Sequence, residues 1–203
     1  INKSKNSQVM GSVTNAASEL ANGQILDIMI SKRLVNFNQD IYFKMIRLKT
    51  ASLISSSAEV GALLSTSDIS KVRKLKSYGI NLGISYQLID DALDLLGDTR
   101  KMGKNTMEDI KEGKVTLPML IALDKAPSKD KRGILKILQK KNFDRKNLDI
   151  LYNFVLENNA VEETLKSASD YSSKAIVAIE SLNKSQYKDS LIALAKENIV
   201  RVS

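Results

Sequence analysis

A chain of 203 residues is long enough to form one domain with a substantial buried core. It contains no cysteine and no histidine, which excludes a disulfide framework and any metal site that depends on thiolate or imidazole ligands. The formal net charge of +8 raises nucleic acid and anionic lipid as partners. We expect no nucleic-acid binding, because basic residues are interspersed with acidic ones and aromatic residues for base stacking are few.

Neither a transmembrane segment nor a signal peptide is visible in the sequence. No apolar run reaches the roughly 18 residues that a membrane-spanning helix needs. The missing cysteines agree with a reducing compartment. We therefore expect a soluble, cytoplasmic protein.

The first part of the chain predicts two long helices. Apolar residues from Val9 to about Arg33 recur at helical spacing. A second helix is expected from about Asp40 to Leu64, in which basic residues precede an uncharged segment from Thr50 to Ala58. The turn that follows contains Ser67 and Asp68, either of which could cap the next helix.

The third predicted helix carries an acidic strip on a mostly apolar body. Asp90 and Asp94 lie one above the other at 3.6 residues per turn, and Asp91 is displaced by about 100°. The neighbouring stripes are rich in leucine and isoleucine, which is typical of a buried helix and disfavours the alternative of a solvated acidic face. Because a buried carboxylate is costly unless it is paired or bound to a metal, the strip predicts a cavity that holds a cation.

The type of cation follows from the available ligands. Carboxylates alone suit a hard ion, Mg²⁺ before Ca²⁺, with water and substrate phosphates completing the coordination shell. A connection with several glycines follows the acidic helix and carries Lys101, Lys104, Lys111 and Lys114. Carboxylates, Mg²⁺ and lysines in one place predict a clamp for a diphosphate, and the basic surplus of the chain would help to attract such an anion.

The remainder of the chain also favours helices. Residues 97–112 are expected to form a mostly irregular loop that closes over a substrate, and Thr116 with Pro118 predicts the start of the next helix. Further helices are expected near Lys129–Lys141, Arg145–Asn158, Val161–Leu182 and Tyr187–Val200. No repeat and no strand-like alternation stands out, so we expect residues 1–203 to form a single all-α domain, a helix bundle.

An ordered set of motifs surrounds the acidic strip. Tyr86-Gln87 precedes the Asp-Asp-x-x-Asp sequence of Asp90 to Asp94, Gly103-Lys104 follows it, and residues 109–118 read D-I-K-E-G-K-V-T-L-P. This region resembles the second aspartate-rich region of the trans-polyprenyl diphosphate synthases, the family that contains farnesyl, geranylgeranyl and octaprenyl diphosphate synthases. Lys49-Thr50-Ala51 resembles the Lys-Thr-Ala of that family's cavity-lining helix, and Gly23-Gln24 matches a pair that faces its cavity.

The resemblance implies a fold, a reaction and roles for particular residues. The fold would be the isoprenoid-synthase type, an antiparallel helix bundle around a central cavity, in a homodimer. In the reaction, which depends on Mg²⁺, an allylic prenyl diphosphate ionises, isopentenyl diphosphate attacks the cation, and a proton is lost. By correspondence, Asp90 would bind metal with support from Asp91 and Asp94, Lys49, Lys104 and more weakly Lys114 would hold the diphosphate, and Thr50 and Gln87 would stabilise the cation.

The sequence also departs from the family pattern. Asp90-Asp91 is the only adjacent aspartate pair, so the first aspartate-rich motif is absent, and no Gly-Gly segment for isopentenyl diphosphate occurs. We therefore expect a bundle that is incomplete at its N-terminal side and a chain that cannot turn over alone. One alternative is a non-catalytic partner subunit of a heteromeric synthase. A terpene cyclase is disfavoured, because no Asn- or Asp-rich second metal motif follows Asn158-Asn159.

Overall fold

The structure, a computed structural model, describes residues 6–32, 37–96 and 107–201. The helices within these ranges are α1 (Ser7–Ser31), α2 (Gln39–Ile46), η1 (Arg47–Ala51), α3 (Ser52–Ser65), α4 (Ile69–Leu96), α6 (Glu108–Lys111), α7 (Leu117–Lys125), α8 (Ser128–Lys140), α9 (Arg145–Glu157), α10 (Ala160–Ile179) and α11 (Gln186–Val200). The described residues contain no strand, which confirms the predicted all-α fold class.

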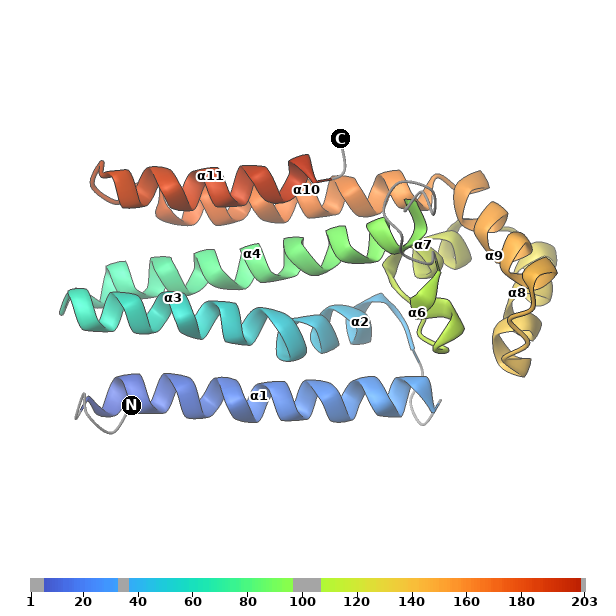
Figure 1. The fold of residues 1–203 in the computed structure, drawn as a ribbon, viewed down its shortest axis with the longest axis horizontal. Helices are drawn as coiled ribbons and strands as arrows, with labels where there is room; N and C mark the ends of the chain where they lie inside the picture. The colour runs from blue at the N-terminus through green and yellow to red at the C-terminus, as the bar shows by residue number, and fades with distance from the viewer. Residues whose placement is uncertain (1–5, 33–36, 97–106, 202–203) are drawn as a thin grey trace.

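The long helices α1, α3, α4, α10 and α11 run side by side along the molecule (Figure 1). Helix α4 is central, because it packs against both α3 and α10. Helix α1 packs on the outer side of α3, and α11 packs on α10 and α4. The shorter helices α6 to α9 gather at one end, next to the C-terminal end of α4 that carries the acidic strip (Figure 1).

Side-chain caps define several helix starts. The side-chain oxygens of Asn6, Asp68 and Asp144 accept backbone N–H groups in the first turns of α1, α4 and α9. Of the two cap candidates in the sequence, Ser67 and Asp68, the structure shows Asp68 as the cap of α4. Thr116 precedes α7 as predicted, with a proline in the first turn. The four helices predicted after Pro127 are found as α8 to α11, within a few residues of their expected ends.

Two parts of the chain differ from the sequence prediction. The single helix expected from about Asp40 to Leu64 is instead α2, the π-helical turn η1 and α3 in succession, because the chain winds more widely at Arg47–Ala51. The loop expected at residues 97–112 lies partly outside the described residues. Its described part contains helix α6, so it is not purely irregular.

The buried core has two clusters that share α4. The larger one surrounds the second half of α4, where Leu88 and Ile89 are fully buried, and it includes residues of α2, α7, α9 and α10. The smaller one holds Tyr78 and Leu82 of α4 against α10 and α11. Each fully buried large side chain contributes about 1.5–3 kcal/mol. The acidic strip therefore lies on the most firmly packed helix.

The described residues contain no candidate membrane span. None of their helices combines the length and the apolar character that crossing a bilayer requires.

Candidate functional site

Two close helix contacts, both made possible by glycine, hold η1 in place. A Cβ atom on Gly23 of α1 would lie 2.5 Å from the backbone nitrogen of Lys49, and one on Gly83 of α4 would lie 2.5 Å from the Cα atom of Ala51. Neither distance is possible for a real side chain, so any larger residue would force the helices apart. Helices α1 and α4 therefore both reach the backbone of η1.

Two consecutive residues of η1, Lys49 and Thr50, make side-chain contacts with α1 and α4 respectively. The Lys49 Nζ atom lies 2.6 Å from Oδ2 of Asp27 on α1. The Thr50 hydroxyl donates a hydrogen bond of 2.9 Å to Oε1 of Gln87 on α4. A π-helical turn often occurs at functional sites. The structure thus brings three sequence-predicted residues, Lys49, Thr50 and Gln87, to one place.

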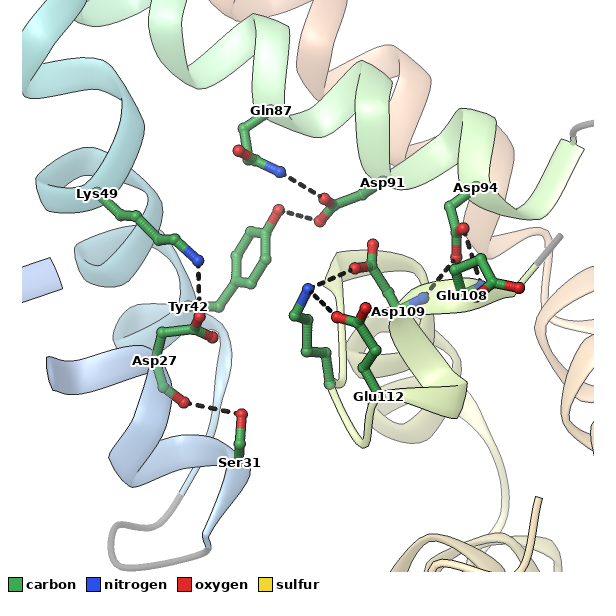
Figure 2. Close-up of polar contacts among 11 residues, drawn as sticks. Asp27, Ser31, Tyr42, Lys49, Gln87, Asp91, Asp94, Glu108, Asp109 and Glu112 are labelled. Atoms are coloured by element: carbon green, nitrogen blue, oxygen red, sulfur yellow. Dashed lines mark hydrogen bonds and ion pairs between the residues drawn. The ribbon is translucent and has the colours of Figure 1, made fainter. Parts of the chain in front are cut away.

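Asp91 is buried, and two side chains donate hydrogen bonds to it in addition to the backbone of Leu117. Its exposed fraction is 2%, its Oδ2 atom accepts from the Tyr42 hydroxyl at 2.5 Å, and its Oδ1 atom accepts from Nε2 of Gln87 at 2.9 Å. Figure 2 shows Tyr42 and Gln87 converging on this carboxyl group. Burial raises the pKa of Asp91 to about 7, although both hydrogen bonds act to lower it.

Asp94 connects α4 to the segment that follows the undescribed residues. Its Oδ1 and Oδ2 atoms accept the backbone N–H groups of Glu108 and Asp109 at 3.0 and 3.3 Å (Figure 2). Burial and the neighbouring Asp109 raise the pKa of Asp94. This aspartate therefore anchors α6 against the C-terminal end of α4.

Asp90 meets a third partner. Its Oδ1 atom lies 3.2 Å from a guanidinium nitrogen of Arg201, and the side chain is 37% exposed. The same guanidinium lies 5.0 Å from the ring centroid of Tyr86, within the range of a cation–π contact. The three aspartates of the strip thus belong to one helix but contact three different parts of the chain.

The lysines predicted to hold a diphosphate have different outcomes. Lys49 is positioned as described above, and Lys104 lies outside the described residues. The Lys114 Nζ atom lies 3.1 Å from Asp109 and 2.6 Å from Glu112. Burial alone would lower the pKa of Lys114, but these two carboxylates raise it above its ordinary value, so the side chain is a firm cation.

A cavity of about 70 Å³ lies where these groups meet. Its charged and polar lining consists of Asp27, Ser31, Tyr42, Lys49, Gln87, Asp91, Asp109, Lys114 and Thr116. On this measure one water molecule needs about 10–15 Å³, so the cavity has room for small polar species. Lys49, Gln87, Asp91 and Lys114, all predicted site residues, share this cavity.

The aspartates of α4 suit a hard metal ion only if water and phosphate oxygens supply most of its ligands. Among residues 6–32, 37–96 and 107–201 no three acidic side chains are arranged to hold a metal by themselves. Mg²⁺ usually takes one or two protein carboxylates and completes its octahedron with water and phosphate oxygens. The half-exposed carboxylate of Asp90 fits that mode, whereas both oxygens of Asp91 already accept hydrogen bonds from side chains.

Sequence reasoning missed two residues of the site. Tyr42 precedes Lys49 by two helical turns, and Asp27 follows Gly23 by one turn on a helix with few charges. Asp27 is only 8% exposed, although it is ionisable. The available signal for Asp27 was its position one helical turn after Gly23, the glycine that permits close packing on η1. For Tyr42 the available signal was only its shared helix face with Lys49.

One known protein family matches most of the chain. Residues 1–155 match the model described as polyprenyl synthetase. The chain belongs to this family.

Two relatives match 97% and 77% of the chain. A prenyl transferase of Cyanidium caldarium is 33% identical over 202 residues, which are 97% of this chain and 59% of that protein. A geranylgeranyl diphosphate synthase of Saccharolobus solfataricus is 32% identical over 157 residues, 77% of this chain and 47% of that protein.

Solved structures of polyprenyl synthases share the fold. A decaprenyl diphosphate synthase from Rhodobacter capsulatus superposes with a TM-score of 0.91 at 30% identity, covering 100% of this chain and 62% of that one. A polyprenyl synthase from Caulobacter crescentus, solved with calcium and isoprenyl diphosphate, gives a TM-score of 0.90 at 30% identity, covering 99% of this chain and 61% of that one. The chain thus spans less than two thirds of these relatives, and it has the all-α isoprenoid-synthase fold.

Proposed function

We propose that this chain belongs to a prenyltransferase that condenses isopentenyl diphosphate with an allylic prenyl diphosphate in isoprenoid biosynthesis. The observation that carries the proposal is the meeting of Lys49, Thr50 and Gln87 beside the aspartate strip of α4. The proposal takes Lys49 as a cation for the diphosphate and the neighbouring Thr50 and Gln87 oxygens as dipoles for a carbocation. Family membership and the names of the related synthases support the same reaction.

The proposed chemistry assigns separate tasks to the side chains. Lys49 and Lys114, with Lys104, hold the allylic diphosphate and stabilise the negative charge that grows as its C–O bond breaks and the electron pair leaves with the diphosphate. The Thr50 and Gln87 oxygens face the positive charge left on the allyl group. The double bond of isopentenyl diphosphate then attacks that carbon, and loss of a proton restores a double bond.

The metal of the proposal is Mg²⁺, with Asp90 as its first ligand and Asp91 and Asp94 in support, directly or through water. When bound, a divalent ion would neutralise the leaving diphosphate as a Lewis acid. Because Asp90 is paired with Arg201 in the described structure, the ion would have to displace or share this contact. The calcium in the Caulobacter crescentus structure is a divalent ion with the same preference for oxygen ligands.

Calorimetric titration with a non-hydrolysable allylic diphosphate analogue, with and without Mg²⁺, tests this function. We expect binding that requires Mg²⁺ and that weakens by at least about tenfold in Asp90→Ala. Asp149→Ala is the matched control, because Asp149 is exposed on α9, away from the cavity. Binding that ignores both Mg²⁺ and the Asp90 substitution would contradict the proposal, and the absence of any binding would favour a non-catalytic partner subunit.

The quaternary state and location complete the proposal. We propose a homodimer, which is supported by large aliphatic side chains that α1 leaves exposed, among them Met10, Ile25 and Ile28. Sedimentation as a single monomeric species would contradict it. The cytoplasmic location is supported by the absence of cysteine from the sequence, whereas a related rice synthase is named as mitochondrial.

A further inference from the structure

Four side chains from three helical elements form one chain of hydrogen bonds. The Tyr42 hydroxyl donates to Asp91, Gln87 donates to the other oxygen of Asp91, and Thr50 donates to Gln87, at 2.5, 2.9 and 2.9 Å. Figure 2 shows the Tyr42, Asp91 and Gln87 part of this chain. The donors run from both ends toward the one acidic group.

Tyr42 is rigidly placed at one end. Its exposed fraction is 1%, and its ring packs edge-on against Phe43 and Phe37, with ring centroids 5.5 and 6.5 Å away. A ring held in this way can direct its hydroxyl to only a narrow region. Asp91 is equally buried, at 2% exposure, and Tyr42 and Gln87 are the side chains that donate to its carboxyl group.

The carboxylate fixes which way the Gln87 amide points. Both oxygens of Asp91 accept hydrogen bonds, and Oδ1 accepts from Nε2 of Gln87, so the NH₂ end of the amide faces Asp91. The carbonyl end must then face Thr50, where it accepts the hydroxyl hydrogen. Because that hydrogen is used, the lone pairs of the Thr50 oxygen remain for other contacts. Rotation of the amide by half a turn would break both bonds at once.

We propose that Tyr42 and Asp91 are positioning residues, which lock the Gln87 amide so that the Gln87 carbonyl oxygen and the Thr50 oxygen present negative dipole ends to the allyl cation. This inference rests on the proposed function, and it deepens it by giving Asp91 a task other than metal binding. Removal of the Tyr42 hydroxyl would leave one Asp91 oxygen without its donor, and the carboxyl group would turn or admit water. The amide would then lose its single orientation.

The test compares two analogues of a short allylic diphosphate in the presence of Mg²⁺. One is an ammonium analogue, which carries a positive charge where the cation would form, and the other is a neutral thiolodiphosphate. The ratio of their affinities measures stabilisation of the cation and cancels the contribution of the diphosphate clamp. In Tyr42→Phe we expect the preference for the ammonium analogue to fall about fivefold to tenfold, with the neutral analogue changing less than about twofold.

Tyr78→Phe is the matched control. Tyr78 is also buried, at 2% exposure, and its hydroxyl donates to the backbone oxygen of Leu191 at 2.8 Å in the other core cluster. Tyr78→Phe loses a buried hydroxyl group as Tyr42→Phe does, so the midpoint of thermal unfolding should shift by a similar amount in both variants. The affinity ratio should change only in Tyr42→Phe. An equal change in both variants would mean a general loss of stability and would overturn the proposal.

Two further measurements separate positioning from packing. The side-chain amide of Gln87, observed by ¹⁵N relaxation without ligand, should be rigid in the wild type and Tyr78→Phe and mobile in Tyr42→Phe. In a Gln87→Ala background, Tyr42→Phe should have no further effect on the affinity ratio, because the two changes act through one chain. A full additional effect would overturn the proposal.

Asp91→Asn provides a second variant should Tyr42→Phe fail to fold. It replaces the carboxylate by a group that can also donate, so the ammonium preference should fall as in Tyr42→Phe. If Mg²⁺-dependent binding of both analogues falls equally and their affinity ratio is unchanged, Asp91 acts only through the metal and the positioning proposal is wrong. If neither analogue binds the wild type, both the proposed function and the positioning proposal fail. If both analogues bind but their affinity ratio is the same in the variants as in the wild type, only the positioning of Gln87 is contradicted.

Discussion

At the scale of single residues, adjacent aspartates on one helix have different physical states. Asp91 is enclosed by Tyr42 and Gln87, and burial raises its pKa to about 7. Asp90, one position earlier, is exposed enough to pair with Arg201 in a more polar environment. The displacement of about 100° between neighbouring helical residues accounts for this difference.

The raised pKa of Asp91 predicts a pH dependence of stability. In the unfolded chain its pKa returns to about 3.9, so the folded state binds more protons between roughly pH 4 and pH 7. The free energy of unfolding should therefore fall as pH rises through this window. Asp91→Asn removes the effect and should flatten the slope, by up to roughly 1.4 kcal/mol per pH unit.

Denaturant unfolding at pH 5 and pH 7 in metal-free buffer measures this slope for both proteins. The difference between them isolates Asp91 from the other carboxylates of the chain. Parallel pH dependences of the wild type and Asp91→Asn would show that Asp91 ionises as readily in the folded state as in the unfolded one.

At the scale of helical elements, the site depends on how closely α4 approaches η1. Gly83 meets Ala51, and Gly79 meets the backbone of Ser55 one turn further along. These contacts bring Gln87 within hydrogen-bond distance of Thr50. The apolar periodicity of α4 predicted that this helix is buried. Which segments contact Gly79 and Gly83 is decided by packing between residues far apart in the sequence.

Gly83→Ala should damage both stability and the site. The added Cβ atom would lie 2.5 Å from the Cα atom of Ala51, so we expect a loss of roughly 1–3 kcal/mol in the free energy of unfolding. The separation of α4 from η1 should also weaken Mg²⁺-dependent analogue binding. Denaturant unfolding and calorimetry measure the two effects.

Gly133→Ala is the matched control for this change. A Cβ on Gly133 would meet nothing within 4 Å, and the residue lies inside α8. Alanine favours helix over glycine, so this variant should gain roughly 0.5–1 kcal/mol without changing binding. Equal stabilities of the two variants would contradict the close contact at Gly83.

At the scale of the whole molecule, most of the net positive charge comes from a segment at one end. Residues 128–146 contain eight basic and two acidic residues, a net charge of +6 out of the +8 of the chain. They form α8 and the start of α9, at the end where α6 and the acidic end of α4 also lie (Figure 1). The Lys141 Nζ atom donates to the backbone oxygen of Ser31 and lies 3.5 Å from where a Cβ of Gly113 would be. The charge is therefore more localised than its apparent scatter along the sequence suggested.

This asymmetry predicts electrostatic steering of the anionic substrate. Reversing two charges on α8, in Lys129→Glu with Lys136→Glu, should slow association of a fluorescent diphosphate analogue by roughly threefold to tenfold at low salt. Lys184→Glu with Lys196→Glu changes the net charge equally, but near α11. Stopped-flow rates measure both, and the difference should vanish at about 1 M salt, where the Debye length is about 3 Å. Equal slowing by both pairs would mean that only net charge matters.

The sequence by itself determined the all-α class, most helix boundaries and the candidate residues Lys49, Thr50, Gln87 and Asp90. These follow from helical periodicity, capping residues and ordered motifs, which are local properties of the chain. Tertiary structure alone decided the π turn at η1 and the separate partners of the three aspartates. Those partners come from α2, from the backbone at α6 and from the end of α11. Their distances from α4 depend on how helices pack across the whole fold, which no local pattern specifies.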